Sequence, residues 1–175
     1  FENNKIYLTI YPSGPENDTR YWGFVYAAGA PASTVFTVTL SNIDVTAPVS
    51  ATLRGLFKGY AATPQHHTKV YINDHLVDNA FWGANAEYSF QVTFPQSYLL
   101  EGVNNIKVEC PLDNGITTDV TLINYFELVY ADRFVAESDR LAFEGQIPGP
   151  VDFRVSNFSN SELELYDITS PQDVI

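Results

Sequence analysis

The chain has 175 residues, of which 45% are apolar and 17% charged; this composition suits one folded domain with a small appendage and excludes a disordered protein. Its 21 acidic and 9 basic side chains give a formal charge of −12, which argues against partners such as nucleic acid or anionic membrane surfaces. Apolar stretches fall well short of about 18 residues, which excludes insertion into a membrane as a helix.

Strand-like segments follow one another from the start of the chain to Tyr130, separated by turns rich in Gly and Pro. Aromatic residues make up 14% of the chain and are interleaved with Val, Ile and Thr, a mixture typical of β-sheets. In residues 34–40, apolar side chains alternate with Thr, as on a half-buried strand. The predicted strands span residues 5–11, 21–26, 34–40, 51–58, 69–77, 87–94, 104–109 and 118–130. Such short antiparallel strands favour a jelly roll or another sandwich.

Residues 132–175 form a second predicted segment, after a first domain that covers residues 1–131. Three more strands are expected within it, at residues 141–145, 151–155 and 163–168. A segment of this length builds little core alone, so it either packs on the first domain or begins the next domain of a longer chain. The chain has no Met and starts at Phe1, so we expect a portion of a longer protein.

The order of four segments resembles the galactose-binding-type jelly roll. They are a strand at residues 51–59, an Asn-Asp hairpin within 69–77, a Gly-Val-Asn-Asn-Ile strand at 102–106, and the return strand at 120–130. The resemblance implies an all-β, antiparallel jelly-roll β-sandwich with a small C-terminal β extension. Domains of this type bind sugars, calcium or neighbouring domains and seldom carry chemistry of their own.

A second resemblance covers almost the whole chain. Seven short sequence motifs occur in an order similar to that in the β-sandwich region that precedes the catalytic domain of gingipain-type secreted cysteine peptidases. They lie at residues 3–7, 14–24, 70–73, 102–104, 124–130, 133–143 and 165–171. The last motif, Leu-Tyr-Asp-Ile-Thr-Ser-Pro, resembles the motif of that family that leads into the peptidase domain. The resemblance implies an accessory module whose partner is the adjacent catalytic domain of the same polypeptide.

No catalytic residue is carried over from that family. Its His lies in a His-Gly context, whereas His66, His67 and His75 are not followed by Gly. Cys110 ends a strand directly before Pro111 and is expected to be a small buried hydrophobe. The chain itself is therefore expected not to be an enzyme, although the resemblance implies a cysteine peptidase as its parent. Carboxylate pairs for glycoside hydrolysis cannot be recognised in sequence, because their separation is three-dimensional.

Two tryptophans are candidate platforms for sugar rings. Trp22 lies in an alternating strand, where packing in the core is the better interpretation. Trp82 follows the expected hairpin and is predicted to lie in a loop, where a ligand could reach it. Asn73 and Asp74 are further ligand candidates, but their residue types suit a two-residue turn with positive φ better.

Metal binding has only weak candidates. His66 and His67 would point to opposite faces of a strand and so could not share one ion; histidines solvated in a loop are the preferred interpretation. Glu16 and Asp18 offer oxygen ligands for a structural calcium ion, but calcium requires six or more oxygens from several segments. A polar turn explains these residues better, and no cofactor is expected.

The sequence thus predicts a secreted or cell-surface module without catalytic activity. In the leading hypothesis it packs beside the catalytic domain of a gingipain-type peptidase and positions it. The alternative hypothesis is a carbohydrate-binding module that tethers a secreted enzyme to glycans through Trp82 and its neighbours; this alternative rests on the resemblance in fold.

Overall fold

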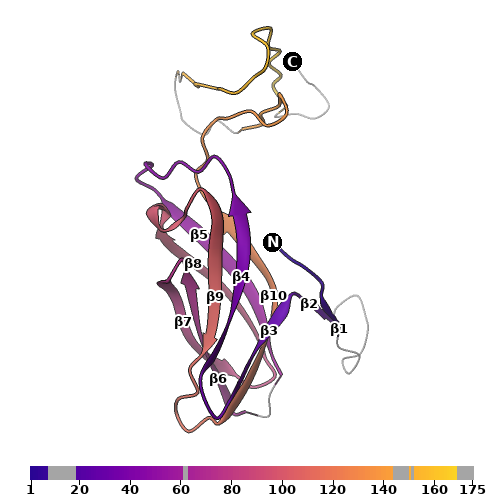
Figure 1. Ribbon diagram of the computed structural model, residues 1–175, viewed down its shortest axis with the longest axis vertical. Coiled ribbons are helices and arrows are strands. Elements are labelled where there is room, and N and C mark those ends of the chain that lie inside the picture. Colours follow the sequence, from indigo (N-terminus) through magenta and orange to yellow (C-terminus); the bar gives the residue numbers. More distant parts are fainter. Residues whose placement is uncertain (8–18, 61–62, 144–149, 151, 169–175) are drawn as a thin grey trace. The chain divides into compact units, whose positions relative to one another are not determined.

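The structure, a computed structural model, describes residues 1–7, 19–60, 63–143, 150 and 152–168. Two compact units make up the chain: Phe1–Asp132 and Arg133–Ile175. The strands lie in the first unit (Figure 1). They are β1 (Ile6–Tyr7), β2 (Arg20–Tyr21), β3 (Gly23–Ala28), β4 (Ala32–Leu40), β5 (Ser50–Gly59), β6 (Gln65–Ile72), β7 (His75–Gly83), β8 (Glu87–Pro95), β9 (Gly102–Cys110) and β10 (Thr118–Val129), with a 3-10 turn, η1 (Gln96–Tyr98), after β8.

Two four-stranded antiparallel sheets form the first unit, in the orders β3-β10-β5-β8 and β4-β9-β6-β7. Along the chain, the strands cross repeatedly from one sheet to the other: β3, β5, β8 and β10 belong to the first sheet, and the strands between them to the second. This arrangement confirms the predicted all-β, antiparallel jelly-roll sandwich. A separate pair, β1 and β2, joins Ile6 to Tyr21 and Tyr7 to Arg20.

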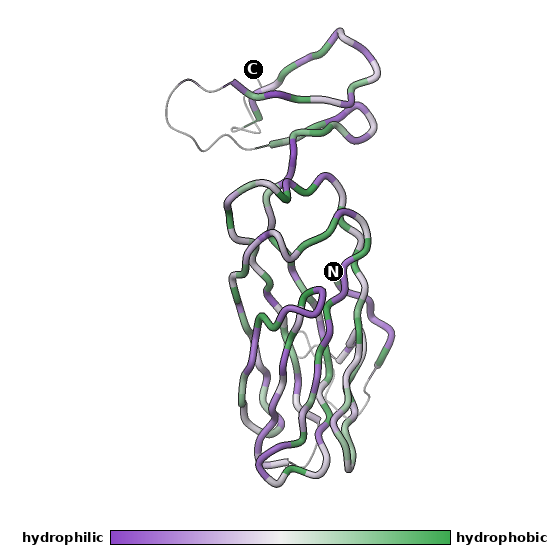
Figure 2. The backbone as a smooth tube through the Cα atoms, turned by 60° about the vertical axis from the view of Figure 1, so that its left-hand side comes forward, coloured by the Kyte–Doolittle hydropathy of each residue, from purple (hydrophilic) through white to green (hydrophobic). Residues whose placement is uncertain are grey.

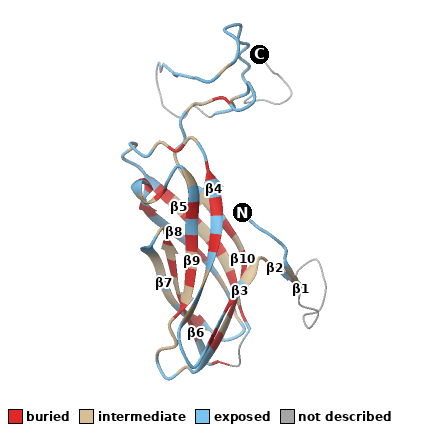
Figure 3. Ribbon diagram, in the orientation of Figure 1, coloured by how far each residue is buried: buried red, intermediate tan, exposed pale blue. Residues whose placement is uncertain are grey.

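The core lies between the two sheets, and hydrophilic and hydrophobic residues are interspersed along the strands (Figure 2). Buried and exposed residues alternate correspondingly along β4, β5 and β9 (Figure 3). Phe36, Phe57 and Phe126 meet edge to face at its centre, at ring-centroid distances of 5.6–5.9 Å. Such aromatic pairs add specific stabilisation to the apolar area that they bury.

Two buried amide side chains hold the loops at one end of the sandwich. The Asn104 Nδ2 group donates to the carbonyls of Leu100 and Gly102, and its Oδ1 accepts from the Leu100 N–H. The Gln96 side chain bonds both the N–H and the carbonyl of Ala131, as well as the carbonyl of Asp44. Each amide thus supplies hydrogen-bond partners to part-buried backbone groups of the loops.

At the open edge between β7 and β8, an acidic side chain faces inward. Asp78 lies on β7, at the edge of the second sheet, and accepts a hydrogen bond of 3.1 Å from the hydroxyl of Tyr88 on β8. Burial raises the pKa of Asp78, and the bond from Tyr88 offsets part of that rise.

Several predicted strand bounds are wrong. The segment 69–77 is two strands, because Asn73 and Asp74 form the turn between β6 and β7, and these strands extend back to Gln65 and on to Gly83. The missed parts contain polar residues that are buried only by tertiary partners. Of the strand expected at residues 5–11, the part from residue 8 lies outside the described residues.

The second unit contains isolated bridges in place of the three predicted strands. Val135 pairs with Ser156 and Glu137 with Arg140, but the described parts of 141–145, 151–155 and 163–168 form no strand. Phe134, Phe143 and Phe153 form a small aromatic cluster, with centroids 4.8–5.5 Å apart. Alternation alone does not produce a strand where no partner strand is available. Nowhere in the described ranges does a helix have the length and apolarity needed to cross a membrane.

Candidate functional site

Trp82 lies in strand β7 and not in the loop that we predicted. Only 8% of the residue is exposed, and its indole N–H donates to the Thr68 hydroxyl at 3.1 Å. The ring stacks on His66 at a centroid distance of 4.3 Å. These contacts support a packing role, and ligand binding by Trp82 stays a prediction.

Asn73 and Asp74 form the predicted two-residue turn, with φ angles of 46° and 68°. The Asn73 amide donates to the Tyr98 carbonyl and to Asn104 Oδ1, both at 2.8 Å, while its oxygen accepts from the Asn105 N–H at 2.9 Å. The side chain of Asn73 is therefore engaged within the protein. Ligand binding by Asn73 and Asp74 also stays a prediction.

His66 and His67 lie in strand β6, and the prediction of solvated loop histidines is wrong. They point to opposite faces, as expected: His66 is fully buried, with its Nδ1 atom 2.6 Å from Asp119 Oδ1. His67 lies 2.7 Å from both Asp113 Oδ2 and Asn79 Oδ1. The carboxylate partners come from about 50 residues downstream, so no local sequence signal could have revealed them.

Cys110 is buried, as predicted. Burial, and next the nearby Asp119 carboxylate, raise the pKa of its thiol to about 12. The sulfur lies 3.6 Å from the Thr121 hydroxyl, which in turn donates to Asp119 Oδ1. A protonated thiol without access to solvent cannot serve as a nucleophile, so this cluster is structural.

The weak calcium candidates, Glu16 and Asp18, lie outside the described residues. Within the described ranges, no three His, Cys, Asp or Glu side chains gather in a way that could hold a metal ion.

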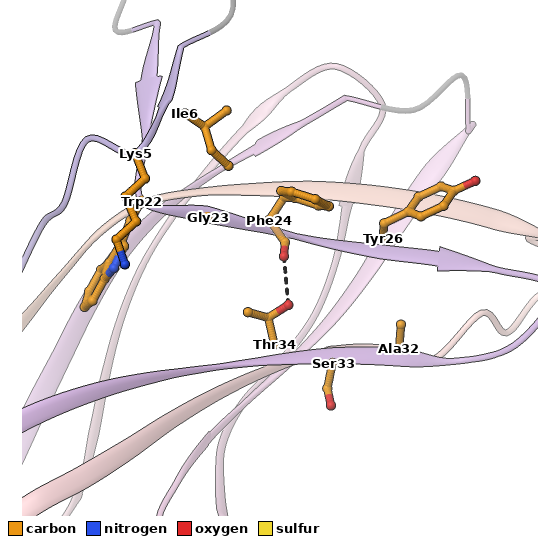
Figure 4. A pocket seen from close by; sticks show the side chains of 9 residues that line it. All are labelled: Lys5, Ile6, Trp22, Gly23, Phe24, Tyr26, Ala32, Ser33 and Thr34. Carbon is orange, nitrogen blue, oxygen red and sulfur yellow. Dashed lines mark hydrogen bonds between the residues drawn. The ribbon is translucent and has the colours of Figure 1, made fainter.

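An open groove of about 510 Å³ lies at the other edge of the sandwich, where β3 of the first sheet runs beside β4 of the second (Figure 4). We call it the β3–β4 groove. It is lined by Lys5, Ile6, Trp22, Gly23, Phe24, Tyr26, Ala32, Ser33 and Thr34.

Aromatic side chains dominate this groove. Phe24 and Tyr26 alternate with buried residues along β3, and they are 48% and 58% exposed. Trp22 turns the other way and is half-buried, with its ring 5.0 Å from Phe36 and edge-on to it. A Cβ atom at Gly23 would lie 2.8 Å from the Phe36 ring, so only glycine leaves room for this packing.

Two hydrogen bonds fix the walls of the groove. The Thr34 hydroxyl donates to the Phe24 carbonyl at 2.8 Å and joins β4 to β3 (Figure 4). The Lys5 N–H donates to the Tyr21 carbonyl at 3.1 Å, which places Lys5 at the end of the groove nearest Trp22.

The lining combines aromatic rings with hydroxyl groups and one ammonium group. None of the nine lining residues is a carboxylate, an imidazole or a thiol. Exposed rings beside hydroxyl groups and one ammonium group form a surface for a ligand with both apolar faces and polar edges. Sequence reasoning singled out Trp22 but missed Phe24 and Tyr26, although the alternation in residues 21–26 already placed them on one face of the strand.

No protein-family model matches this chain, and no curated protein matches its sequence. Among solved structures, a family 35 carbohydrate-binding module from an environmental isolate is 16% identical, with 61% of this chain and 74% of that chain covered and a TM-score of 0.42. The module CBM35 from Paenibacillus barcinonensis is 14% identical, with coverage of 75% and 92% and a TM-score of 0.41. Dimeric latent PorU from Porphyromonas gingivalis is 11% identical; the match covers 74% of this chain but 13% of PorU, with a TM-score of 0.49. None of these similarities assigns the chain to a family.

Proposed function

We propose that the first unit is a non-catalytic carbohydrate-binding module and that the β3–β4 groove holds the glycan. The observation that carries this proposal is the pair of exposed rings, Phe24 and Tyr26, along one wall of an open groove of about 510 Å³. This is the alternative hypothesis of the sequence analysis, with its site moved from Trp82 to β3. A module of this kind would tether a secreted or cell-surface enzyme to its substrate.

The physical basis is the two-sided character of a sugar. A pyranose ring has an apolar face, which gains from contact with an aromatic ring, and an edge of hydroxyl groups, which needs hydrogen-bond partners. Phe24 and Tyr26 supply the rings, while the hydroxyl groups of Tyr26 and Thr34 supply polar partners close by. Because the Thr34 proton already goes to the Phe24 carbonyl, its oxygen remains able to accept from a sugar hydroxyl.

The test is affinity electrophoresis of the whole chain through gels that contain soluble polysaccharides, neutral and acidic, one per gel. Phe24→Ala and Tyr26→Ala should each weaken retardation by roughly tenfold in affinity, the effect of truncating a central aromatic contact. Phe81→Ala is a matched control, since Phe81 is also 48% exposed but lies on β7, outside the groove. Retardation that all three variants retain would place the site elsewhere, and no retardation in any gel would reject the proposal.

A second function is an accessory role beside a gingipain-type peptidase domain, the leading hypothesis of the sequence analysis. One observation favours it: the second unit exposes Leu163, Leu165, Tyr166 and Ile168, which are 51–85% exposed. A run of exposed apolar side chains is typical of a surface that another domain covers.

An experiment on the native protein distinguishes the two functions. An antibody raised against residues 1–131 would detect the secreted chain, and a cysteine-peptidase probe would report a reactive thiol. A labelled band far above 19.5 kDa supports the accessory role. A chain that does not label, or that accompanies a glycan-cleaving activity, supports carbohydrate binding alone.

A further inference from the structure

We propose that the β3–β4 groove selects an acidic glycan, in which a carboxylate or sulfate group binds the Lys5 ammonium while a neighbouring sugar lies against Phe24 and Tyr26. This inference rests on the proposed function and names the class of its ligand.

The charge of the groove differs from that of the whole chain. The chain carries 21 acidic and 9 basic side chains, yet among the residues that the structure describes the lining of the groove includes no acidic residue and one basic residue, Lys5. An anion that enters the groove therefore meets a positive charge at contact distance. Screening over about 8 Å at physiological salt limits the opposing field of the acidic surface.

Lys5 differs in its surroundings from three other cations of the first unit. Arg54 pairs with Glu127 at 2.9 Å, Lys58 with Glu87 at 3.8 Å, and the Lys107 ammonium lies 4.0 Å from the centre of the Tyr71 ring. The side chain of Lys5 is exposed and has no such partner among the described residues. Its charge is thus available to a ligand without the loss of an existing ion pair.

The hydrogen-bond donors of the groove also favour an acidic ligand. A lysine ammonium has three donors and no acceptor, and Phe24 and Trp22 supply no acceptor from their side chains. The side-chain acceptors of the groove are the hydroxyl oxygens of Tyr26, Ser33 and Thr34, whereas the Lys5 ammonium can only donate. A carboxylate or a sulfate group would supply charged acceptor oxygens for that ammonium, which form stronger hydrogen bonds with it than the neutral hydroxyl groups of a sugar do.

The positions of Lys5 and of the two exposed rings also predict how the glycan is oriented along the groove. Lys5 lies at the end where Tyr21 and Trp22 are found, and Phe24 and Tyr26 follow along β3 (Figure 4). The acidic group should therefore lie toward Trp22, and the sugar that stacks on the rings should lie toward Ala28, one or more residues along the glycan.

The experiment uses ligand pairs that differ in charge: oligogalacturonate with its methyl ester, oligosaccharides of hyaluronate with their methyl ester, and dextran sulfate with dextran. Calorimetry measures the affinity of the whole chain for both members of each pair. In at least one pair we expect the acidic member to bind roughly tenfold more tightly, as for a hydrogen bond between charged groups. Lys5→Gln should abolish that preference without weakening the neutral member, and Lys5→Arg should retain it.

Failure of this inference is distinguishable from failure of the proposed function. If Lys5→Gln leaves the ratio between acidic and neutral members unchanged while Phe24→Ala weakens both, the groove binds glycans but Lys5 does not select them. The same conclusion follows if the neutral members bind as well as the acidic ones. If no probe binds here and no polysaccharide retards the chain, both proposals are rejected. Urea unfolding of Lys5→Gln checks that the fold is intact, as expected for an exposed side chain.

Discussion

Gly55 is a position where space, and not backbone conformation, requires glycine. It lies opposite Phe90 on β8 and Phe126 on β10, and a Cβ atom there would approach the two rings to 2.6 and 3.2 Å. We expect Gly55→Ala to destabilise the chain by about 1–3 kcal/mol, the usual effect of overpacking a core. In Gly83→Ala the nearest atom is 3.8 Å away, so this variant should stay within about 0.5 kcal/mol. Urea unfolding of both variants measures the difference.

Cys110 should make the stability of the fold sensitive to alkali. Its pKa is raised from 9.0 to about 12, so the unfolded chain releases the thiol proton first as the pH rises. The unfolded state then binds fewer protons than the folded state, and the free energy of unfolding falls by about 1.4 kcal/mol per pH unit above pH 9. Unfolding in urea at pH 8, 9 and 10 should show this fall for the natural chain and a smaller one for Cys110→Ala. Equal slopes for the two would contradict it.

Single residues were predictable from the sequence where their surroundings are local. The burial of Cys110 followed from an alternating strand, and the turn at Asn73 from its residue type. The environment of His66 was not predictable, since the Asp119 that bonds it belongs to the opposite sheet. Partners of this kind become neighbours only once the two sheets pack.

At the scale of elements, the two turn residues between β6 and β7 contribute unequally to the stability of this hairpin. Asn73 combines a positive φ with three hydrogen bonds from its side chain, whereas the side chain of Asp74 makes no hydrogen bond among the described residues. Asn73→Ala should cost roughly 1–3 kcal/mol, because it removes three hydrogen bonds, two of them part-buried. Asp74→Gly should be neutral or about 1 kcal/mol more stable, since glycine adopts this φ without strain. Chemical unfolding would show the ranking, and equal losses in both variants would refute it.

Strands were predictable where polar and apolar residues alternate without interruption, as in β4 and β8. The start of β6 and the end of β7 were missed, because His66 and Asp78 are polar residues at inward positions. The candidate groove was harder still to predict. Its walls are the edges of two different sheets, which only the jelly-roll connection from β3 to β4 places side by side.

At the scale of the whole molecule, the first unit is expected to fold without the second. The described apolar residues that are fully buried lie in the first unit, with the exception of Ala136. We predict that a fragment of residues 1–132 unfolds in one cooperative transition, with a urea midpoint close to that of the whole chain. A fragment of residues 133–175 should give no such transition, because it buries too little apolar surface. A large fall in the midpoint of the first fragment would show that the second unit stabilises the sandwich.

The inward-facing carboxylate of Asp78 affects whether copies of this molecule aggregate with one another. A bare edge strand is a template on which another chain can extend the sheet, and this growth leads to insoluble aggregates. A strand from another copy that paired with β7 would remove further water from a carboxylate whose pKa burial already raises. The edge therefore resists addition of a further strand, and many copies displayed side by side at high concentration should remain separate molecules.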